Sequence, residues 1–395
     1  MKKFSVPSAP SAVSSVARQI IRRCDELGKI SEEKGCLTRT FASPAMKRAN
    51  KLVGSWMRAA GMSVREDAAF NLVGRLPSSK RGAKCLVIGS HLDTVRNAGK
   101  YDGPLGVLLG VSVAERLRKH KLPFHLEVAG FSDEEGVKYQ TTYLGSRAMC
   151  GLLAARDLSR IREKGLARAK RSKSELLAYL EAHIEQGPVL ENDDVPVGVV
   201  SAIAGQTRIR AAFTGRAGHA GTTPMHLRQD ALCGAADVVL AAEKTGVLAT
   251  VGQCDIENSA SNVIPGRVAF TLDVRDVQDA KRRAACAKLR QFAGVVARRR
   301  GLKLLWEIVQ ETPTAAMDNK LTTVLCKAAG HAPLLPSGAG HDAAVMSKVC
   351  PAAMLFVRCK DGISHHPEES VRERDVAVAV DVLTRAVLDL CKRHG

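Results

Sequence analysis

The stretches CLVIGSHLDT (Cys85–Thr94) and LEVAGFSDEEG (Leu126–Gly136) decide the fold class of this chain. Each is a short apolar run that ends in polar residues of the histidine or carboxylate type. The segment between them, residues 106–118, has the apolar pattern of a buried helix. Strand, polar loop, helix and strand in this order predict an α/β sheet with a functional site at the carboxyl ends of its strands.

The pattern continues outward from this unit and divides the chain. A helix is predicted over 45–61 before it, and helices over 319–329 and 375–392 and a strand over 352–358 after it. The intervening block reads strand, helix, two strands, helix and strand, over 207–214, 230–244, 248–255, 267–274, 278–300 and 303–310. This β-α-β-β-α-β order is ferredoxin-like. We therefore predict a discontinuous catalytic domain (18–205 and 316–395), an inserted domain (206–315) and a flexible lead-in (1–17).

Histidine, aspartate and glutamate residues gather in five glycine-rich, turn-like segments. These read GSHLDTVRNAGKYDG (89–103), FSDEEG (131–136), EAHIEQG (181–187), GAGHDA (338–343) and GISHHPEE (362–369). A single histidine is usually structural, so the evidence lies in the set. Imidazoles and carboxylates in such settings suit one or two divalent metal ions that activate water.

Individual roles follow from neighbouring residues in the first two of these segments. His91 can bind metal while Asp93, two residues later, orients its imidazole. Asp102 suits a bridge between two ions, although an aspartate before glycine is also a common turn residue. Glu134 and Glu135 are adjacent, so one can bind metal while the other acts as a general base, and a solvated acidic loop is the alternative.

The remaining motif histidines leave choices open. His183 has apolar flanks, and only one of His365 and His366 need be a ligand. His341 is flanked by glycine on one side, which permits close backbone approach. Taken on its own, His219, which lies among glycines and threonines, is a turn residue.

Composition limits the other classes of function. The net charge of +19 is partly concentrated in residues 160–173 and 298–300, but only 4% of residues are aromatic and no nucleic-acid-binding motif is present. We interpret the charge as a solvated basic surface and predict no nucleic-acid partner. No apolar run approaches the roughly 20 residues of a membrane span. Eleven cysteines without a CxxC pair indicate reduced thiols and a cytoplasmic location.

The motifs, in this order from about residue 45 to the C-terminus, resemble those of the M20-type metallo-amidohydrolases that act on ureido groups. This family contains allantoate amidohydrolases, N-carbamoyl-L-amino acid hydrolases and β-ureidopropionases. The resemblance implies a zinc-peptidase-like α/β/α catalytic domain with an inserted lid that also forms a homodimer. It further implies two divalent ions, Mn²⁺ or Zn²⁺.

The family pattern also implies a role for each motif residue. One ion takes His91, Asp102 and His183, and the second takes Asp102, Glu135 and His365. Glu134 is the general base and Asp93 holds His91. His366 departs from the pattern, because the family often has asparagine or serine there.

Further matches fall in the inserted domain. GRAGHAGTTP places His219 where the family stabilises the oxyanion, often in the partner subunit's site. SASNVIPG and FTLDVRD place Asn262 and Arg275 as contacts to the substrate amide and carboxylate. A guanidinium fork suits a carboxylate, although a strand arginine is otherwise more often a salt-bridge partner. Gln206 and His341 are further candidate substrate contacts.

Two strings favour the allantoate branch, FSDEEGVKYQTTYLGS and MLFVRCKDGISHHPEES, with Arg358–Cys359 where carbamoylases tend to have proline and serine. The implied reaction is attack of a metal-bridging hydroxide on a ureido carbonyl, which converts allantoate into ureidoglycine, ammonia and carbon dioxide. Hydrolysis of N-carbamoyl-L-amino acids or 3-ureidopropionate by the same site is the alternative. Aminoacylase or peptidase activity is a weaker one, and a ligand-binding relative without catalysis is weaker still.

Overall fold

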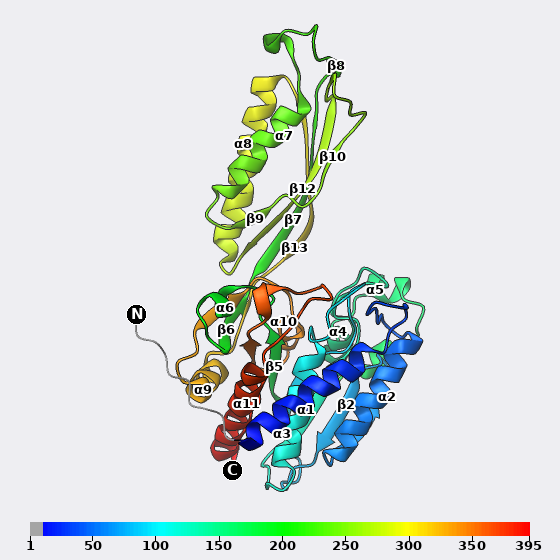
Figure 1. Cartoon of the computed structure of the whole chain (residues 1–395), viewed down its shortest axis with the longest axis vertical. Coiled ribbons are helices and arrows are strands. Elements are labelled where there is room, and N and C mark those ends of the chain that lie inside the picture. Colours follow the sequence, from blue (N-terminus) through cyan, green and yellow to red (C-terminus); the bar gives the residue numbers. More distant parts are fainter. Residues whose placement is uncertain (1–10) are drawn as a thin grey trace. The chain divides into compact units, whose positions relative to one another are not determined.

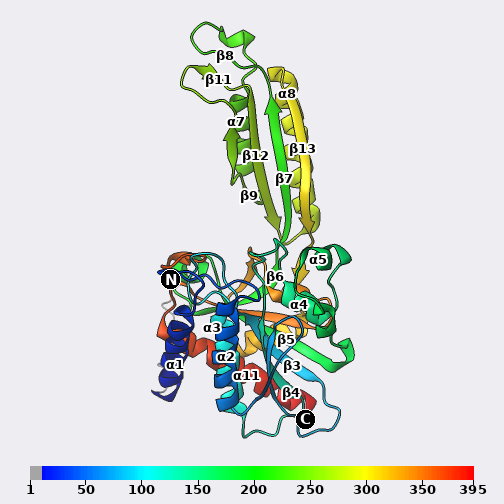
Figure 2. The same cartoon turned by 90° about the vertical axis from the view of Figure 1, so that its right-hand side faces the viewer.

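The computed structural model describes residues 11–395, which fall into two compact units. The first comprises Met1–Ser201 with Ala316–Gly395, and the second comprises Ala202–Ala315. The second unit begins four residues before the predicted start at 206, and both place its end at 315. Figures 1 and 2 show the two units, each of which has its own sheet and helices.

The first unit is built on a mixed sheet. In order across it lie β1 (Ser63–Glu66), β2 (Leu72–Leu76), β4 (His125–Phe131), β3 (Cys85–His91), β5 (Leu176–Ile184), β16 (Ala352–Val357), β6 (Val197–Ile203) and β14 (Ala315–Ala316), with β15 (Leu334–Ser337) also on β6. The four strands β4, β3, β5 and β16 are parallel. Their carboxyl ends therefore meet at one edge of the sheet.

Helices cover both faces of this sheet, which makes the central strands buried throughout. On one face α1 (Ser11–Gly28), α3 (Pro104–Leu117) and α11 (Glu373–His394) contact one another, and Figure 1 shows them side by side. The other longer helices are α2 (Pro44–Ala59) and α9 (Asn319–Ala329). Shorter helices are α4 (Leu144–Cys150), α5 (Ala155–Arg160), α6 (Val189–Asn192) and α10 (Asp342–Met346), of which α10 contacts β5 and β16.

The flexible lead-in predicted over residues 1–17 needs correction. Residues 1–10 lie outside the described part, but α1 begins at Ser11. The apolar residues Ala17, Ile20, Cys24 and Leu27 recur at helical spacing and are all fully buried. This stripe packs α1 into the core of the first unit, and residues 11–17 are the first turns of that helix in place of a lead-in.

The second unit has the predicted ferredoxin-like order. Its elements are β7 (Gly205–Thr214), α7 (Ala231–Glu243), β9 (Leu248–Thr250), β10 (Cys254–Ile256), β12 (Arg267–Asp276), α8 (Asp279–Arg300) and β13 (Lys303–Thr312). The antiparallel sheet runs β10-β12-β7-β13, with β9 also on β12. The helices α7 and α8 contact each other and pack on this sheet (Figure 2).

The strand predicted over 248–255 is interrupted, and the pairing shows why. Thr250 pairs with Asp273 and Cys254 pairs with Phe270, so four steps along the edge oppose three along β12. One extra residue is a β-bulge. Gly252 lies in this bulge and separates β9 from β10.

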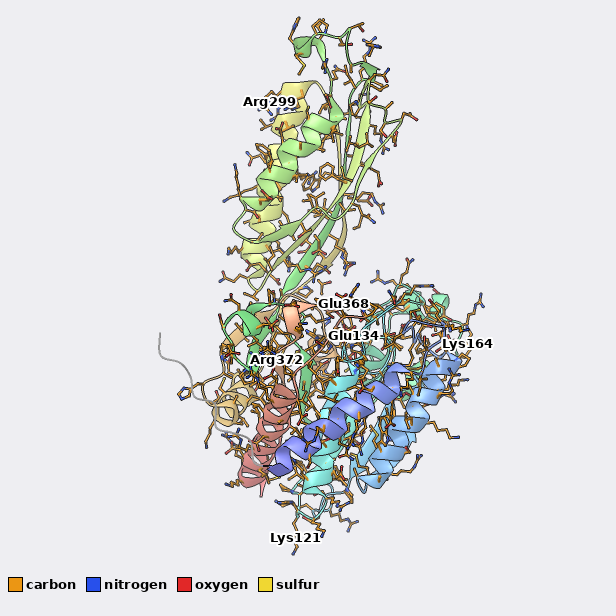
Figure 3. The ribbon with its side chains drawn as sticks, in the orientation of Figure 1. Lys121, Glu134, Lys164, Arg299, Glu368 and Arg372 are labelled. Carbon is orange, nitrogen blue, oxygen red and sulfur yellow. The ribbon has the colours of Figure 1, made fainter. Side chains whose placement is uncertain are left out.

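Three further features bear on the expectations from composition: exposed basic residues, free thiols and the apolarity of the helices. Lys121 and Lys164 are exposed on the first unit and Arg299 projects from α8, whereas Glu134 lies inside the first unit (Figure 3). All eleven cysteines are free thiols. Among residues 11–395, none of the helices combines the length and the apolarity that crossing a membrane requires.

Candidate metal centre

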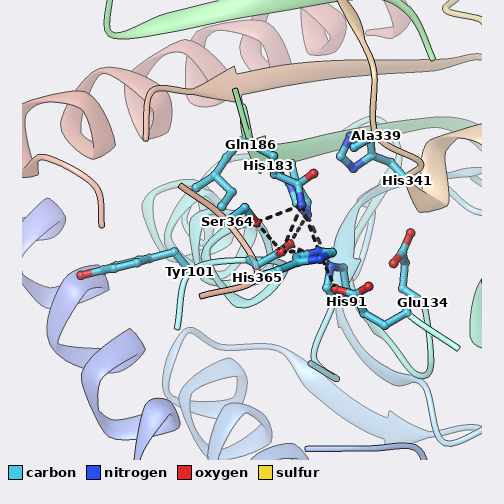
Figure 4. Close-up of polar contacts among 12 residues, drawn as sticks. His91, Tyr101, Glu134, His183, Gln186, Ala339, His341, Ser364 and His365 are labelled. Atoms are coloured by element: carbon cyan, nitrogen blue, oxygen red, sulfur yellow. Dashed lines mark hydrogen bonds and ion pairs between the residues drawn. The ribbon is translucent and has the colours of Figure 1, made fainter. Parts of the chain in front are cut away.

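The parallel strands bring the predicted metal ligands together at one edge of the first unit's sheet. His91 is the last residue of β3, His183 lies one residue before the end of β5, and Glu135 follows β4. Asp102 lies in the loop before α3, and His365 follows β16 after a short 3-10 turn. Figure 4 shows His91, His183 and His365 converging.

Asp102 is the centre of the cluster because each of its oxygens faces imidazole. Its Oδ1 lies 3.0 Å from His183 Nε2 and 3.5 Å from His91 Nε2. Its Oδ2 lies 3.1 Å from His365 Nε2, which is also 3.3 Å from Glu135 Oε1. Two groups of three potential ligands, His91–Asp102–His183 and Asp102–Glu135–His365, therefore share one carboxylate.

The hydrogen bonds of the buried group, His91, Asp102 and His183, are consistent with a cation site. His91 Nδ1 is 3.1 Å from the Asp93 carbonyl oxygen, and His183 Nδ1 is 3.0 Å from that of Ile184. A carbonyl only accepts, so each Nδ1 carries a proton, and in the neutral imidazole the lone pair of each Nε2 is directed at Asp102 Oδ1. Among the described residues, that buried oxygen accepts no hydrogen bond. With both imidazoles neutral, three lone pairs would converge away from water, and a divalent ion would satisfy all of them.

The electrostatics of the same groups agree with this. Burial lowers the pKa of His91 and of His183, but nearby carboxylates outweigh burial and raise both above the usual range. Asp102 acts on both histidines, and Asp93 and Glu134 also act on His91. Asp102 and Glu135 raise the pKa of His365 to about 10. The cluster therefore stabilises positive charge, which bound metal would supply in place of protons.

The directions of the two side chains show which of the neighbouring histidines, His365 or His366, lies in the cluster. His365 has a left-handed backbone (φ 57°), and its Nε2 faces Asp102 and Glu135. His366 is more than half exposed, and its nearest acidic partner is Glu368 at 4.0 Å. The structure thus places His365 in the cluster and turns His366 away from it.

Asp93 and Glu134, predicted as the residue that holds His91 and as the general base, both lie beside the cluster. The two carboxylate oxygens of Asp93 accept hydrogen bonds from the backbone N–H groups of Glu134 (3.1 Å) and Glu135 (3.2 Å). Glu134 is only 7% exposed. Burial raises its pKa well above the usual range, and the positive field of His91 opposes this shift. A buried carboxyl beside a water-activating site suits a general base.

Three residues that support Asp102 were not singled out from the sequence. Gln186 Nε2 and Ser364 Oγ donate to Asp102 Oδ2 at 3.1 and 2.8 Å. Glu369 Oε1 accepts from the backbone N–H groups of Tyr101 (2.7 Å) and Asp102 (2.9 Å). All three stand inside quoted motifs, so the signal was present, but their hydrogen bonds depend on how the loops meet.

His341, a predicted substrate contact, is buried against a metal ligand. Its ring lies 4.5 Å from that of His183 in an edge-on arrangement, and its Nε2 lies 2.9 Å from Ser337 Oγ. Burial holds the pKa of His341 well below the usual range. In this structure the neutral imidazole therefore packs against His183, and its contact with substrate stays a prediction.

The four residues predicted in the inserted domain form two separate pairs within the second unit. His219 on β8 (Gly218–His219) pairs with Val263 on β11 (Val263–Ile264), next to Asn262. Arg275 and Gln206 pair at the opposite end of β12 and β7 from Arg267 and Thr214. The eight residue steps from Gln206 to Thr214 span roughly 26 Å. Figures 1 and 2 show β8 beyond the Thr214 end.

Arg275 already contacts a carboxylate of its own strand. Its Nε lies 2.8 Å from Asp273 Oδ1 and its Nη2 lies 3.0 Å from Asp273 Oδ2. Gln206 Nε2 donates to the same Oδ2 at 2.6 Å. A cavity of ≈ 640 Å³ within the second unit is lined by both Asp273 and Arg275, with Arg208, Thr250 and Thr271. Arg275 is therefore placed on a cavity wall as a paired cation.

Comparisons with known proteins agree with this geometry. A sequence model of peptidase family M20/M25/M40 matches residues 87–389. The chain is 37% identical to allantoate deiminase 2 of Glycine max, with 95% of this chain and 94% of that protein aligned. It is 38% identical to an N-carbamoyl-L-amino acid amidohydrolase of Geobacillus stearothermophilus, with 94% and 98% aligned.

Solved structures show the same architecture. A hydantoinase/carbamoylase family amidase of Burkholderia multivorans superposes with a TM-score of 0.88 at 32% identity, over 94% of this chain and 97% of that one. A second, from Burkholderia ambifaria, gives 0.86 at 33% identity over the same shares. Fold, cluster and sequence agree, and the chain belongs to peptidase family M20/M25/M40 as a metal-dependent amidohydrolase that cleaves C–N bonds.

Proposed function

We propose that this enzyme hydrolyses the ureido group of allantoate, giving ureidoglycine, ammonia and carbon dioxide. The observation that carries the proposal is the shared-carboxylate cluster around Asp102 with the buried Glu134 beside it. The similarity to allantoate deiminases over 95% of the chain supports the substrate.

Two divalent ions, Mn²⁺ or Zn²⁺, would be held by His91, Asp102 and His183 and by Asp102, Glu135 and His365. When bound, they would polarise the ureido carbonyl and lower the pKa of the attacking water. Glu134 takes a proton from that water and delivers it to the nitrogen that leaves as ammonia. The carbamate left on the other nitrogen then loses carbon dioxide, which balances one substrate and one water against three products.

The second-unit residues would bind the remaining groups of the substrate. Arg275 is suited to its carboxylate, whereas Asn262 and His219 are suited to its amide and to the developing oxyanion. The roughly 26 Å between the ends of β7 exceeds the length of a small ureido acid. One second unit therefore cannot place both pairs on one substrate molecule, and we propose a homodimer in which a second copy supplies one pair.

N-carbamoyl-L-amino acids are the second candidate substrates. The 38% identity to an N-carbamoyl-L-amino acid amidohydrolase is as high as that to the allantoate deiminases. Both substrate classes present a carboxylate and a ureido carbonyl, so the cluster and Arg275 serve either. Discrimination must come from how the site treats the second ureido group of allantoate.

The test is ammonia release by metal-reconstituted enzyme with allantoate, several N-carbamoyl-L-amino acids and 3-ureidopropionate, compared by kcat/KM. A preference of at least about tenfold for allantoate, which corresponds to roughly 1.4 kcal/mol of transition-state binding, supports the proposal. Preference for a carbamoyl amino acid reassigns the substrate but keeps the site. Turnover of acyl or peptide bonds without ammonia release would overturn the ureido assignment.

A further inference from the structure

A short segment before α2 runs along the loop that carries the first metal ligands. Arg39 N–H donates to Thr94 Oγ1 (2.9 Å), and Thr94 N–H donates back to the Arg39 carbonyl (2.9 Å). Two residues earlier, the Leu37 carbonyl accepts from Ala98 N–H at 2.8 Å. Residues 37–39 thus brace the loop from His91 to Asp102, which we call the metal loop.

The side chain of Arg39 ties this loop to the end of a helix. Its Nε donates to the Leu92 carbonyl at 2.7 Å, between His91 and Asp93 in the chain. Its Nη1 donates to the carbonyls of Leu27 (3.0 Å) and Ile30 (3.2 Å), at and just after the last turn of α1. A guanidinium can bridge two such directions because its N–H groups form a rigid fork.

The charge of Arg39 lies in an unusual environment. The residue is fully buried, and among the described residues no carboxylate lies within ion-pair distance of it. Asp93 is the acidic group whose charge acts on it. Burial lowers the pKa of Arg39 to about 10, so the guanidinium remains cationic at neutral pH. A buried cation is costly, and here its hydrogen bonds go to carbonyls instead of a paired anion.

The consequences for the metal cluster follow along a chain of contacts. Arg39 fixes the carbonyl of Leu92, whose neighbours are the ligand His91 and Asp93. Asp93 in turn holds the backbone of Glu134 and Glu135. Displacement of Leu92 would therefore move a ligand of one group and, through Asp93, a ligand of the other.

We propose that Arg39 is a positioning residue of the metal centre, which sets metal affinity by clamping the metal loop to the end of α1. It touches neither the ligand atoms nor the site of hydrolysis. The proposal rests on divalent metal use by the cluster and is independent of which ureido acid is the substrate.

The test compares metal affinity with stability in Arg39→Met and Arg39→Lys, by competition of Zn²⁺ or Mn²⁺ against a chelating indicator and by thermal unfolding of the metal-free proteins. Loss of an outer-shell contact typically weakens metal binding by about 10- to 100-fold, which we expect for Arg39→Met. Arg39→Lys keeps the charge but cannot span both sets of carbonyls, so we expect it to restore less than half of the loss on a logarithmic scale.

Arg282→Met is the matched control, because Arg282 is equally buried but lies on α8 and bonds Thr207 and the Thr312 carbonyl. It should lower stability and leave metal affinity unchanged. If Arg39→Met does not fold, Thr94→Val tests the same brace by removing the acceptor of Arg39 N–H. Wild-type metal affinity in any folded Arg39 variant, or full rescue by lysine, would overturn the proposal. Changed substrate preference with normal metal affinity would instead concern the proposed function.

Discussion

The metal cluster of the first unit and the predicted substrate residues of the second unit are organised in opposite ways. Around Asp102, four side chains from separate segments converge, and a buried acceptor oxygen lacks a donor among the described residues. In the second unit, Arg275 is already bound by Asp273, and His219 and Asn262 lie beyond the far end of β7. The metal cluster lies at one place in the first unit and has an acceptor oxygen that a cation would satisfy. The substrate residues of the second unit lie at two separate places, and Arg275 already has a carboxylate partner.

This difference indicates which part of the function each unit can carry alone. The first unit contains the proposed metal ligands and the proposed base, so chemistry should fail when either is altered. The second unit offers charge and hydrogen bonds to the substrate, and changes there should act mainly on binding. Variants in each unit therefore test this difference.

The largest effect is expected from Glu134→Gln. Loss of the proton acceptor should lower kcat by about 10²- to 10⁴-fold, because general base catalysis contributes that much. Metal content, measured by elemental analysis, should stay normal. Glu368→Gln, in the exposed GISHHPEE loop, is the control and should leave both unchanged. Near-normal turnover of Glu134→Gln would remove this residue from the mechanism.

Metal removal should destabilise the first unit selectively. At a free metal concentration 100 times the dissociation constant, binding to the folded state contributes about 2.7 kcal/mol. Hydrogen exchange of metal-free and reconstituted protein should therefore differ in β3, β5 and the metal loop. The core strands β7 and β12 of the second unit serve as the internal control. Equal loss of protection in both units would contradict the assignment of the cluster to one unit.

Arg275→Ala tests the second unit. Removing a charged hydrogen-bonding partner costs about 1.5–3 kcal/mol, so kcat/KM for carboxylate substrates should fall by about 10- to 100-fold, mainly through KM. Arg210→Ala, an exposed arginine of β7 that pairs with Glu307 at 3.8 Å, is the control. Unchanged kinetics on a carboxylate substrate would exclude Arg275 from binding.

The smallest effect is expected from Asp273→Asn. The Asp273–Arg275 pair is partly exposed, so its worth should be about 0.2–1 kcal/mol. Neutralising Asp273 frees the Arg275 fork for substrate, and KM for allantoate should fall by up to about fivefold. A rise in KM would show instead that Asp273 orients Arg275 for its ligand.

Much of the fold could be predicted from the sequence because the patterns that indicate its strands and helices are local. Apolar runs ending in GSH and SDEEG marked β3 and β4, and the β-α-β-β-α-β order of the second unit follows from periodicity alone. Strand β5 was not predicted, because Glu181 and His183 interrupt its apolar pattern although both are buried. Helix α1 was not predicted, and its first turns were assigned to a flexible lead-in.

The features of the site likewise divide into those that follow from local sequence and those that depend on packing. Motif spacing and residue type determined which side chains could bind metal, because histidine and carboxylate beside glycine carry that chemistry wherever they stand. The packing of the folded chain determines that His365 and not His366 faces Asp102 and that Gln186 and Ser364 hold that carboxylate. It also determines that Glu369 holds the backbone of Asp102 and that Arg39 bonds the loop next to His91. Those outcomes depend on the direction of side chains from segments far apart in sequence, and direction is fixed only when the parallel strands and their loops pack together.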